Sequence, residues 1–191
     1  MKLSKHAKLH SRNDAGFTLI EVLISMFILT IGLLSLLGVL GLAVSATMAS
    51  EEDGIAKQLA QDAFENIYTA RDSANIDWPD VENTGAAGGI FVPGFQPINN
   101  AGNDGIIGTA DDSGAGALAL SLPGPDGITG TADDIPVPLT NFKRQISITD
   151  VNSGGSLVAN LKTVTVTIQY TTPRSKFPKQ YVLSGYISQY R

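Results

Sequence analysis

A long uncharged stretch near the N-terminus limits what this chain can fold into more than any other feature. The 29 residues from Val22 to Ser50 include no Asp, Glu, Lys or Arg. As a single helix they would extend about 43 Å, whereas the hydrocarbon core of a bilayer is about 30 Å thick. We therefore predict one membrane-spanning helix, with the rest of the chain folded outside the bilayer.

The charges on either side of this stretch predict its orientation. Residues 1–16 are polar and basic, whereas Glu51, Glu52 and Asp53 follow the stretch. Because basic residues favour the cytoplasmic side of a membrane, the N-terminus is expected in the cytoplasm and the bulk of the chain outside it. An ordinary secretory signal has a shorter apolar segment, of about 7 to 15 residues.

The junction between the leader and the apolar stretch carries a specific motif. Gly16 ends the leader, Phe17 opens the apolar segment, and Glu21 is its only charge before Glu51. The residues GFTLIEVLI at 16–24 resemble the processing and methylation motif of type IV pilin-like precursors. The resemblance implies that a prepilin peptidase cuts between Gly16 and Phe17 and methylates the new amino terminus of Phe17. The alternative is a signal anchor that is never cut.

Glu21 requires an explanation because a carboxylate within a membrane segment is costly, and such residues are usually functional. The resemblance implies that Glu21 pairs with the methylated N-terminal ammonium of a neighbouring subunit during assembly. The alternative is a first-turn acid that the dipole of its own helix stabilises by about 0.3 to 1 kcal/mol.

Beyond the apolar stretch, the helix is expected to continue to about Arg71. No proline precedes Pro79, and apolar residues recur every four positions at Ile55, Leu59, Ala63 and Ile67. We therefore divide the helix into a membrane-spanning and filament-core part, residues 17–50, and an amphipathic part, residues 51–72.

The remaining chain separates into a loop and a sheet. Residues 73–140 are rich in Gly, Pro, Asn and Asp, which predicts one long irregular loop, attached to the core by Trp78, Phe91 and Phe95. Residues 141–191 predict an antiparallel sheet. Its strands are expected at 145–151, 161–171 and 181–190, with a hairpin turn at 152–155. The result is an α+β fold of the pilin-like kind, in which the sheet covers the apolar face of the amphipathic helix.

The predicted loop includes a duplicated sequence. DGIIGTADD at 104–112 recurs as DGITGTADD at 126–134. Its carboxylates are Asp104, Asp111, Asp112, Asp126, Asp133 and Asp134. Carboxylates among freely turning glycines suit a hard cation, so Ca²⁺ is the one cofactor that the sequence suggests. The alternative is a duplicated turn in which each aspartate accepts hydrogen bonds from its own backbone.

Composition bears on function by exclusion. The chain contains no cysteine, which excludes disulfides and thiolate chemistry, and both histidines, His6 and His10, lie in the leader. We therefore expect no enzyme and no nucleic-acid partner. The resemblance implies a structural subunit that is inserted in the inner membrane, then built with other pilin subunits into a pilus on the cell surface.

Within this family, the apolar segment is most similar to minor pilins of the PilV type. A pseudopilin of type II secretion, or a subunit of a competence pilus, shares the same processing motif. An interpretation from another class is a single-pass membrane protein that never polymerises and exports a ligand-binding or adhesive domain.

Overall fold

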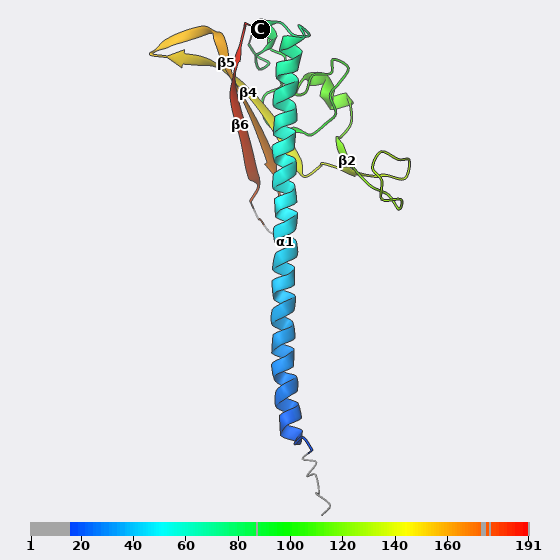
Figure 1. Cartoon of the computed structure of the whole chain (residues 1–191). Helices are drawn as coiled ribbons and strands as arrows, with labels where there is room; N and C mark the ends of the chain where they lie inside the picture. The colour runs from blue at the N-terminus through cyan, green and yellow to red at the C-terminus, as the bar shows by residue number, and fades with distance from the viewer. Residues whose placement is uncertain (1–15, 87, 173–174, 176, 191) are drawn as a thin grey trace, which may run out of the picture. The chain divides into compact units, whose positions relative to one another are not determined.

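One long helix forms the N-terminal part of the chain. The computed structural model describes residues 16–86, 88–172, 175 and 177–190, so that most of the predicted leader lies outside the described residues. Helix α1 (Leu19–Asp72) is continuous, and thus confirms the long helix predicted from the sequence (Figure 1). Contacts divide the chain into two units, residues 1–44 and residues 45–191, which are described separately.

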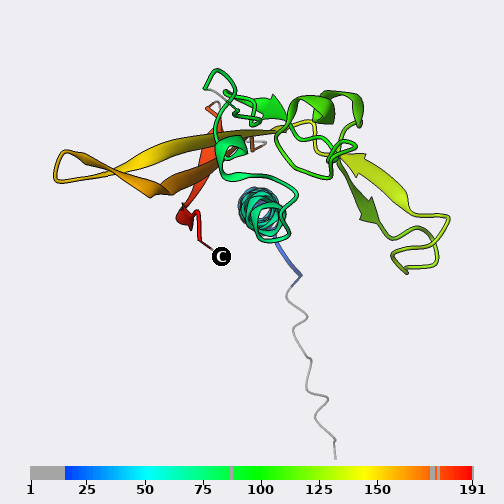
Figure 2. The same cartoon turned by 90° about the horizontal axis from the view of Figure 1, so that it is seen from above.

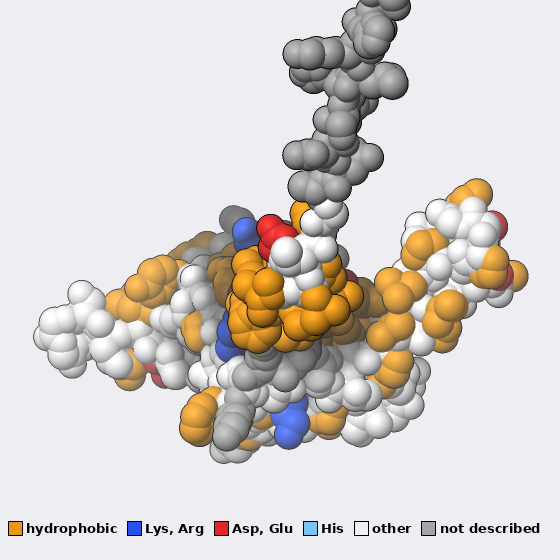
Figure 3. Space-filling model, turned by 90° about the horizontal axis from the view of Figure 1, so that it is seen from below, with side chains coloured by type: hydrophobic (Ala, Val, Ile, Leu, Met, Phe, Trp, Pro, Cys, Tyr) orange, Lys and Arg blue, Asp and Glu red, His pale blue; other side chains and the backbone are white. Residues whose placement is uncertain are grey.

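In the first unit, every described residue is exposed. The helix is apolar on all sides, as its end-on view shows (Figure 3). Its hydroxyl groups are satisfied within the helix, because Ser25, Thr30 and Ser35 each donate to the carbonyl four residues earlier. By length and composition, α1 is the one described helix that could cross a membrane.

The second unit is built on a four-stranded antiparallel sheet. Its strands are β1 (Gln96–Pro97), β4 (Phe142–Ser153), β5 (Ser156–Tyr170) and β6 (Lys179–Ser188), in the order β1-β4-β5-β6. The C-terminal part of α1 packs on this sheet, so the predicted α+β fold is confirmed. β4 and β5 continue beyond the predicted strands into a projecting hairpin, which turns at Gly154 and Gly155 (Figure 2).

The core lies between α1 and the sheet. On β5 the side chains of Val164, Val166 and Ile168 are fully buried, as the predicted alternation requires. The buried face of α1 is made largely of small residues: Ala56, Leu59, Ala60, Ala63, Ile67 and Ala70. Small side chains let the helix approach the sheet closely. At Gly185 of β6, a Cβ atom would lie 2.3 Å from the ring of Phe64, so a larger side chain would not fit without a shift.

The segment between helix and sheet is largely irregular, but it includes elements that the sequence did not predict. These are strand β1 of the sheet, two short 3-10 helices, η1 (Trp78–Asp80) and η2 (Ala110–Gly114), and a hairpin of β2 (Ala119–Leu122) and β3 (Ile135–Pro138). Phe91 is fully buried, as expected of a residue that attaches the segment to the core, whereas Trp78 and Phe95 are half-buried. The β2–β3 hairpin projects away from the β4–β5 hairpin (Figure 2).

Candidate functional site

The predicted processing site is at the exposed start of the first unit. Gly16, Phe17 and Thr18 precede the helix and have no regular secondary structure. Phe17 is 86% exposed, so its apolar side chain is accessible next to the predicted scissile bond. The leader residues that would accompany Gly16 into a peptidase, 1–15, lie outside the described residues.

Glu21 takes part in a capping box at the start of α1. Thr18 is the N-cap residue: its hydroxyl oxygen accepts a hydrogen bond from the backbone N–H of Glu21 at 3.3 Å. In return, the Glu21 carboxylate accepts from the backbone N–H of Thr18 at 3.0 Å and from its hydroxyl at 2.8 Å. Two N–H groups that the first helical turn would leave unpaired are therefore satisfied.

This geometry gives Glu21 a local role in addition to the intersubunit role predicted from the sequence. The helix dipole was expected from the sequence but the capping role of Thr18 was not, although Thr-x-x-Glu before an apolar segment is a recognisable capping signal. A carboxylate that already accepts hydrogen bonds is less costly to bring out of water. The hydrogen bonds from Thr18 therefore reduce the cost of placing the Glu21 carboxylate next to the membrane.

A comparison with known families identifies this segment. Residues 11–37 match the family model described as the prokaryotic N-terminal methylation motif. The N-terminus of this chain carries a prokaryotic N-terminal methylation motif. The match supports a type IV pilin-like precursor with a membrane anchor, and covers Gly16, Phe17 and Glu21. No curated protein and no solved structure matches the chain.

The duplicated Asp-Gly sequences form two turns of the same structure. We name residues 102–112 the first turn and residues 124–134 the second turn. In the first turn, Asp104 accepts from the N–H of Ile106 at 2.8 Å and Asp112 accepts from the N–H of Gly108 at 2.6 Å. The equivalent bonds of the second turn measure 2.8 and 2.7 Å. Each turn thus holds its own shape.

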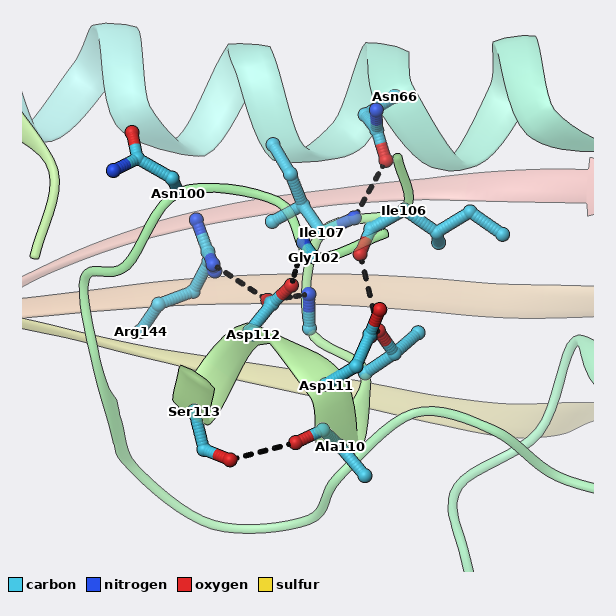
Figure 4. Close-up of polar contacts among 12 residues, drawn as sticks. Asn66, Asn100, Gly102, Ile106, Ile107, Ala110, Asp111, Asp112, Ser113 and Arg144 are labelled. Atoms are coloured by element: carbon cyan, nitrogen blue, oxygen red, sulfur yellow. Dashed lines mark hydrogen bonds and ion pairs between the residues drawn. The ribbon is translucent and has the colours of Figure 1, made fainter. Parts of the chain in front are cut away.

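The two turns differ in what surrounds them. The first turn packs against α1 and β4, where Asp112 also accepts from the N–H of Gly102 at 3.0 Å and lies 3.7 Å from the guanidinium of Arg144 (Figure 4). The second turn lies at the exposed end of the β2–β3 hairpin. Its aspartate equivalent to Asp112 is Asp134, which accepts from the hydroxyl of Ser121 at 2.6 Å.

The pKa values of these two equivalent carboxyl groups shift in opposite directions. Burial raises the pKa of Asp112, although the N–H groups of Gly108 and Gly102 and the charge of Arg144 oppose the shift. Burial also lowers the pKa of Arg144 to about 10, against the effect of Asp112. The pKa of Asp134 is lowered instead, by its hydrogen bonds from Ser121 and Gly130. Only the first turn includes a buried ion pair.

Calcium binding stays a prediction for both turns. Within the part of the chain that the structure describes, no group of three or more Asp, Glu or His side chains is arranged to hold a metal ion. The carboxylates instead accept hydrogen bonds from N–H and hydroxyl groups of their own turn, in the manner of the alternative interpretation. Asp111 and Asp133, for example, each accept from the threonine two residues earlier at 2.6 Å.

A calcium titration tests this point. If the carboxylates only stabilise their own turns, millimolar Ca²⁺ and an excess of chelator will give the same Tm for the full chain in detergent, since the carboxylate oxygens already have hydrogen-bond donors. The measurement is thermal unfolding followed by circular dichroism, together with calorimetric titration of the ion. A rise in Tm with Ca²⁺ that Asp133→Ala abolishes would instead establish the calcium site.

Proposed function

We propose that this chain is a structural subunit of a type IV pilus, a minor pilin that is cut after Gly16 and methylated on Phe17. The observation that carries the proposal is the methylation motif at 11–37, which coincides with the start of an apolar helix whose described residues are all exposed up to Val44. Such a helix requires a bilayer or other helices around it. Once assembled, it would be covered by the equivalent helices of neighbouring subunits.

The second unit supports this function by its position in the chain. It follows the membrane segment directly, on the side that the charge distribution predicts to be outside the cytoplasm. The Asp53 carboxylate connects its helix to the sheet, since it accepts from the hydroxyl of Tyr170 at 2.7 Å and pairs with Lys179 at 3.1 Å. The helix that would assemble thus continues into the domain that the filament would display. Catalysis forms no part of the proposal.

A subunit of this kind has several partners, and other functions would use the same motif. The partners are prepilin peptidase, the inner membrane and other pilin subunits, and the final location is the pilus at the cell surface. A pseudopilin or competence-pilus subunit would carry the same motif, and the genes next to this one would distinguish these systems. A single-pass protein that never polymerises would keep its leader.

Variants of the capping box test the predicted role of Glu21 in assembly. We expect Glu21→Gln and Glu21→Ala to be inserted and cut normally but to be poorly incorporated into filaments, because both lose the charge that would pair with a neighbouring amino terminus. The measurement is the amount of mature chain in the sheared filament fraction relative to the membrane fraction.

Two features of these variants separate assembly from helix capping. Glutamine can keep the capping hydrogen bond, whereas Thr18→Ala removes the cap at a cost of about 1 kcal/mol and keeps the charge. Thr18→Ala should therefore be incorporated almost normally. If Glu21→Gln is incorporated as well as the natural chain and Thr18→Ala is not, Glu21 acts only as a cap.

A further inference from the structure

The first turn shows how this chain binds an Asp-Gly turn. The side-chain amide of Asn66 on α1 donates to the carbonyl of Gly105 at 3.0 Å and accepts from the N–H of Ile107 at 2.8 Å (Figure 4). Between these two bonds, the side chain of Ile106 is only 4% exposed. One amide on a helix, together with burial of one aliphatic side chain in the hydrophobic core, therefore holds the turn.

The second turn presents the same groups without such a partner. Ile128, which is equivalent to Ile106, is 61% exposed. The carbonyl of Gly127 and the N–H of Thr129, which are equivalent to the groups bonded by Asn66, have no hydrogen bond to any described residue. Because internal hydrogen bonds already hold the second turn in shape, it would lose little conformational freedom on binding.

Helix α1, which binds the first turn, also offers a second site of similar chemistry where another such turn could bind. Ile55, Leu59, Asp62 and Asn66 are spaced three or four residues apart and form one stripe along α1. The first turn covers the end of the stripe at Asn66. At the other end, a pocket of 210 Å³ lies between the helix and the base of the β2–β3 hairpin. Aliphatic side chains line it: Ile55, Leu59, Leu118, Leu120 and Leu139.

Polar groups at this pocket match those of the second turn. Gln58 and Asp62 also line the pocket. The Gln58 amide can donate to a carbonyl such as that of Gly127, and either side chain can accept from an N–H such as that of Thr129. Together they offer the donor and the acceptor that Asn66 supplies to the first turn.

We propose that the second turn of one copy binds the pocket at Ile55–Asp62 of a second copy, with Ile128 inserted among the aliphatic side chains. The turn cannot enter the pocket of its own chain, because the β2–β3 hairpin separates them: its base forms the pocket wall and its other end carries the turn. A second copy brings both parts together without bending the hairpin. The contact rests on the proposed function in one respect, that assembly brings copies side by side.

Engineered cysteines test this contact. No other disulfide can form within or between copies of the chain, because its natural sequence contains no cysteine. Full-length chains that carry Gln58→Cys and Thr129→Cys are expressed together in the natural host, with each variant alone as a control. We expect a disulfide-linked dimer on non-reducing gels only when both are present. Adding Ile128→Asp to the Thr129→Cys chain should abolish the dimer. Adding Leu157→Asp should leave it, since Leu157 is 65% exposed, much like Ile128, but lies on the other hairpin.

Filament assembly is followed separately, by the intact mass of the chain and by its amount in the sheared filament fraction. The outcomes therefore distinguish the contact between copies from filament assembly. Mature, assembled chains that give no dimer, or that cross-link only to a different protein, would overturn the contact and leave the proposed function in place. A dimer that resists Ile128→Asp would overturn the insertion of Ile128. A dimer of uncut chains that form no filament would support the contact and refute the proposed function.

Discussion

Gly16→Ala will leave the chain uncut in the membrane and absent from filaments, whereas the natural chain will be recovered without residues 1–16 and with a methylated Phe17. The reason is access to the backbone. Glycine has no Cβ, so the peptide on its carboxyl side can be approached closely by a membrane-embedded peptidase. Intact-mass measurement and N-terminal sequencing of membrane-extracted protein, with and without the peptidase, decide the result.

The matched control is Gly32→Ala, the same substitution inside the apolar helix. A Cβ atom at Gly32 would meet no atom within 4 Å, and alanine favours helix, so this variant should be cut and assembled normally. Intact chains that begin at Met1, recovered from cells with normal filaments, would contradict the precursor interpretation. They would favour the signal anchor that is never cut.

Asp112→Ala should be the most destabilising of the aspartate substitutions in the two turns. It removes the acceptor of the Gly102 and Gly108 N–H groups and leaves the Arg144 guanidinium, 5% exposed, without its ion-pair partner. Breaking a buried ion pair costs about 3 to 5 kcal/mol, and each kcal/mol lowers the Tm by about 2 to 4 °C in a domain of 150 to 250 residues. Thermal unfolding of the full chain in detergent measures the loss.

Asp134→Ala provides the control, because Asp134 occupies the same position in the exposed second turn. It should lower the Tm far less than Asp112→Ala does, because its hydrogen bonds from Ser121 and Gly130 are exposed to solvent. Adding Arg144→Met to Asp112→Ala should restore part of the loss, since the unpaired buried charge is removed as well. Equal losses for Asp112→Ala and Asp134→Ala would show that the ion pair contributes nothing to stability.

The parts of the fold that local sequence patterns encode were predicted well. The apolar helix follows from its composition, and β5 from the alternation of Val164, Val166 and Ile168 with threonines. The β2–β3 hairpin was not predicted, because residues 123–134 separate its strands and no short turn signal joins them. The capping role of Thr18 was also not predicted, although its signal, Thr-x-x-Glu, is local and was present in the sequence.

The sequence by itself determined the membrane helix, the processing motif and the α+β class, since each depends on residues close together in the chain. It also revealed that the Asp-Gly turn is duplicated, but the two copies differ by only one residue in nine. Only the tertiary structure decided that one copy is buried against Asn66 and Arg144 and the other is exposed. Those partners lie 39 residues before Gly105 and 32 after Asp112, and no local pattern encodes contacts across such distances.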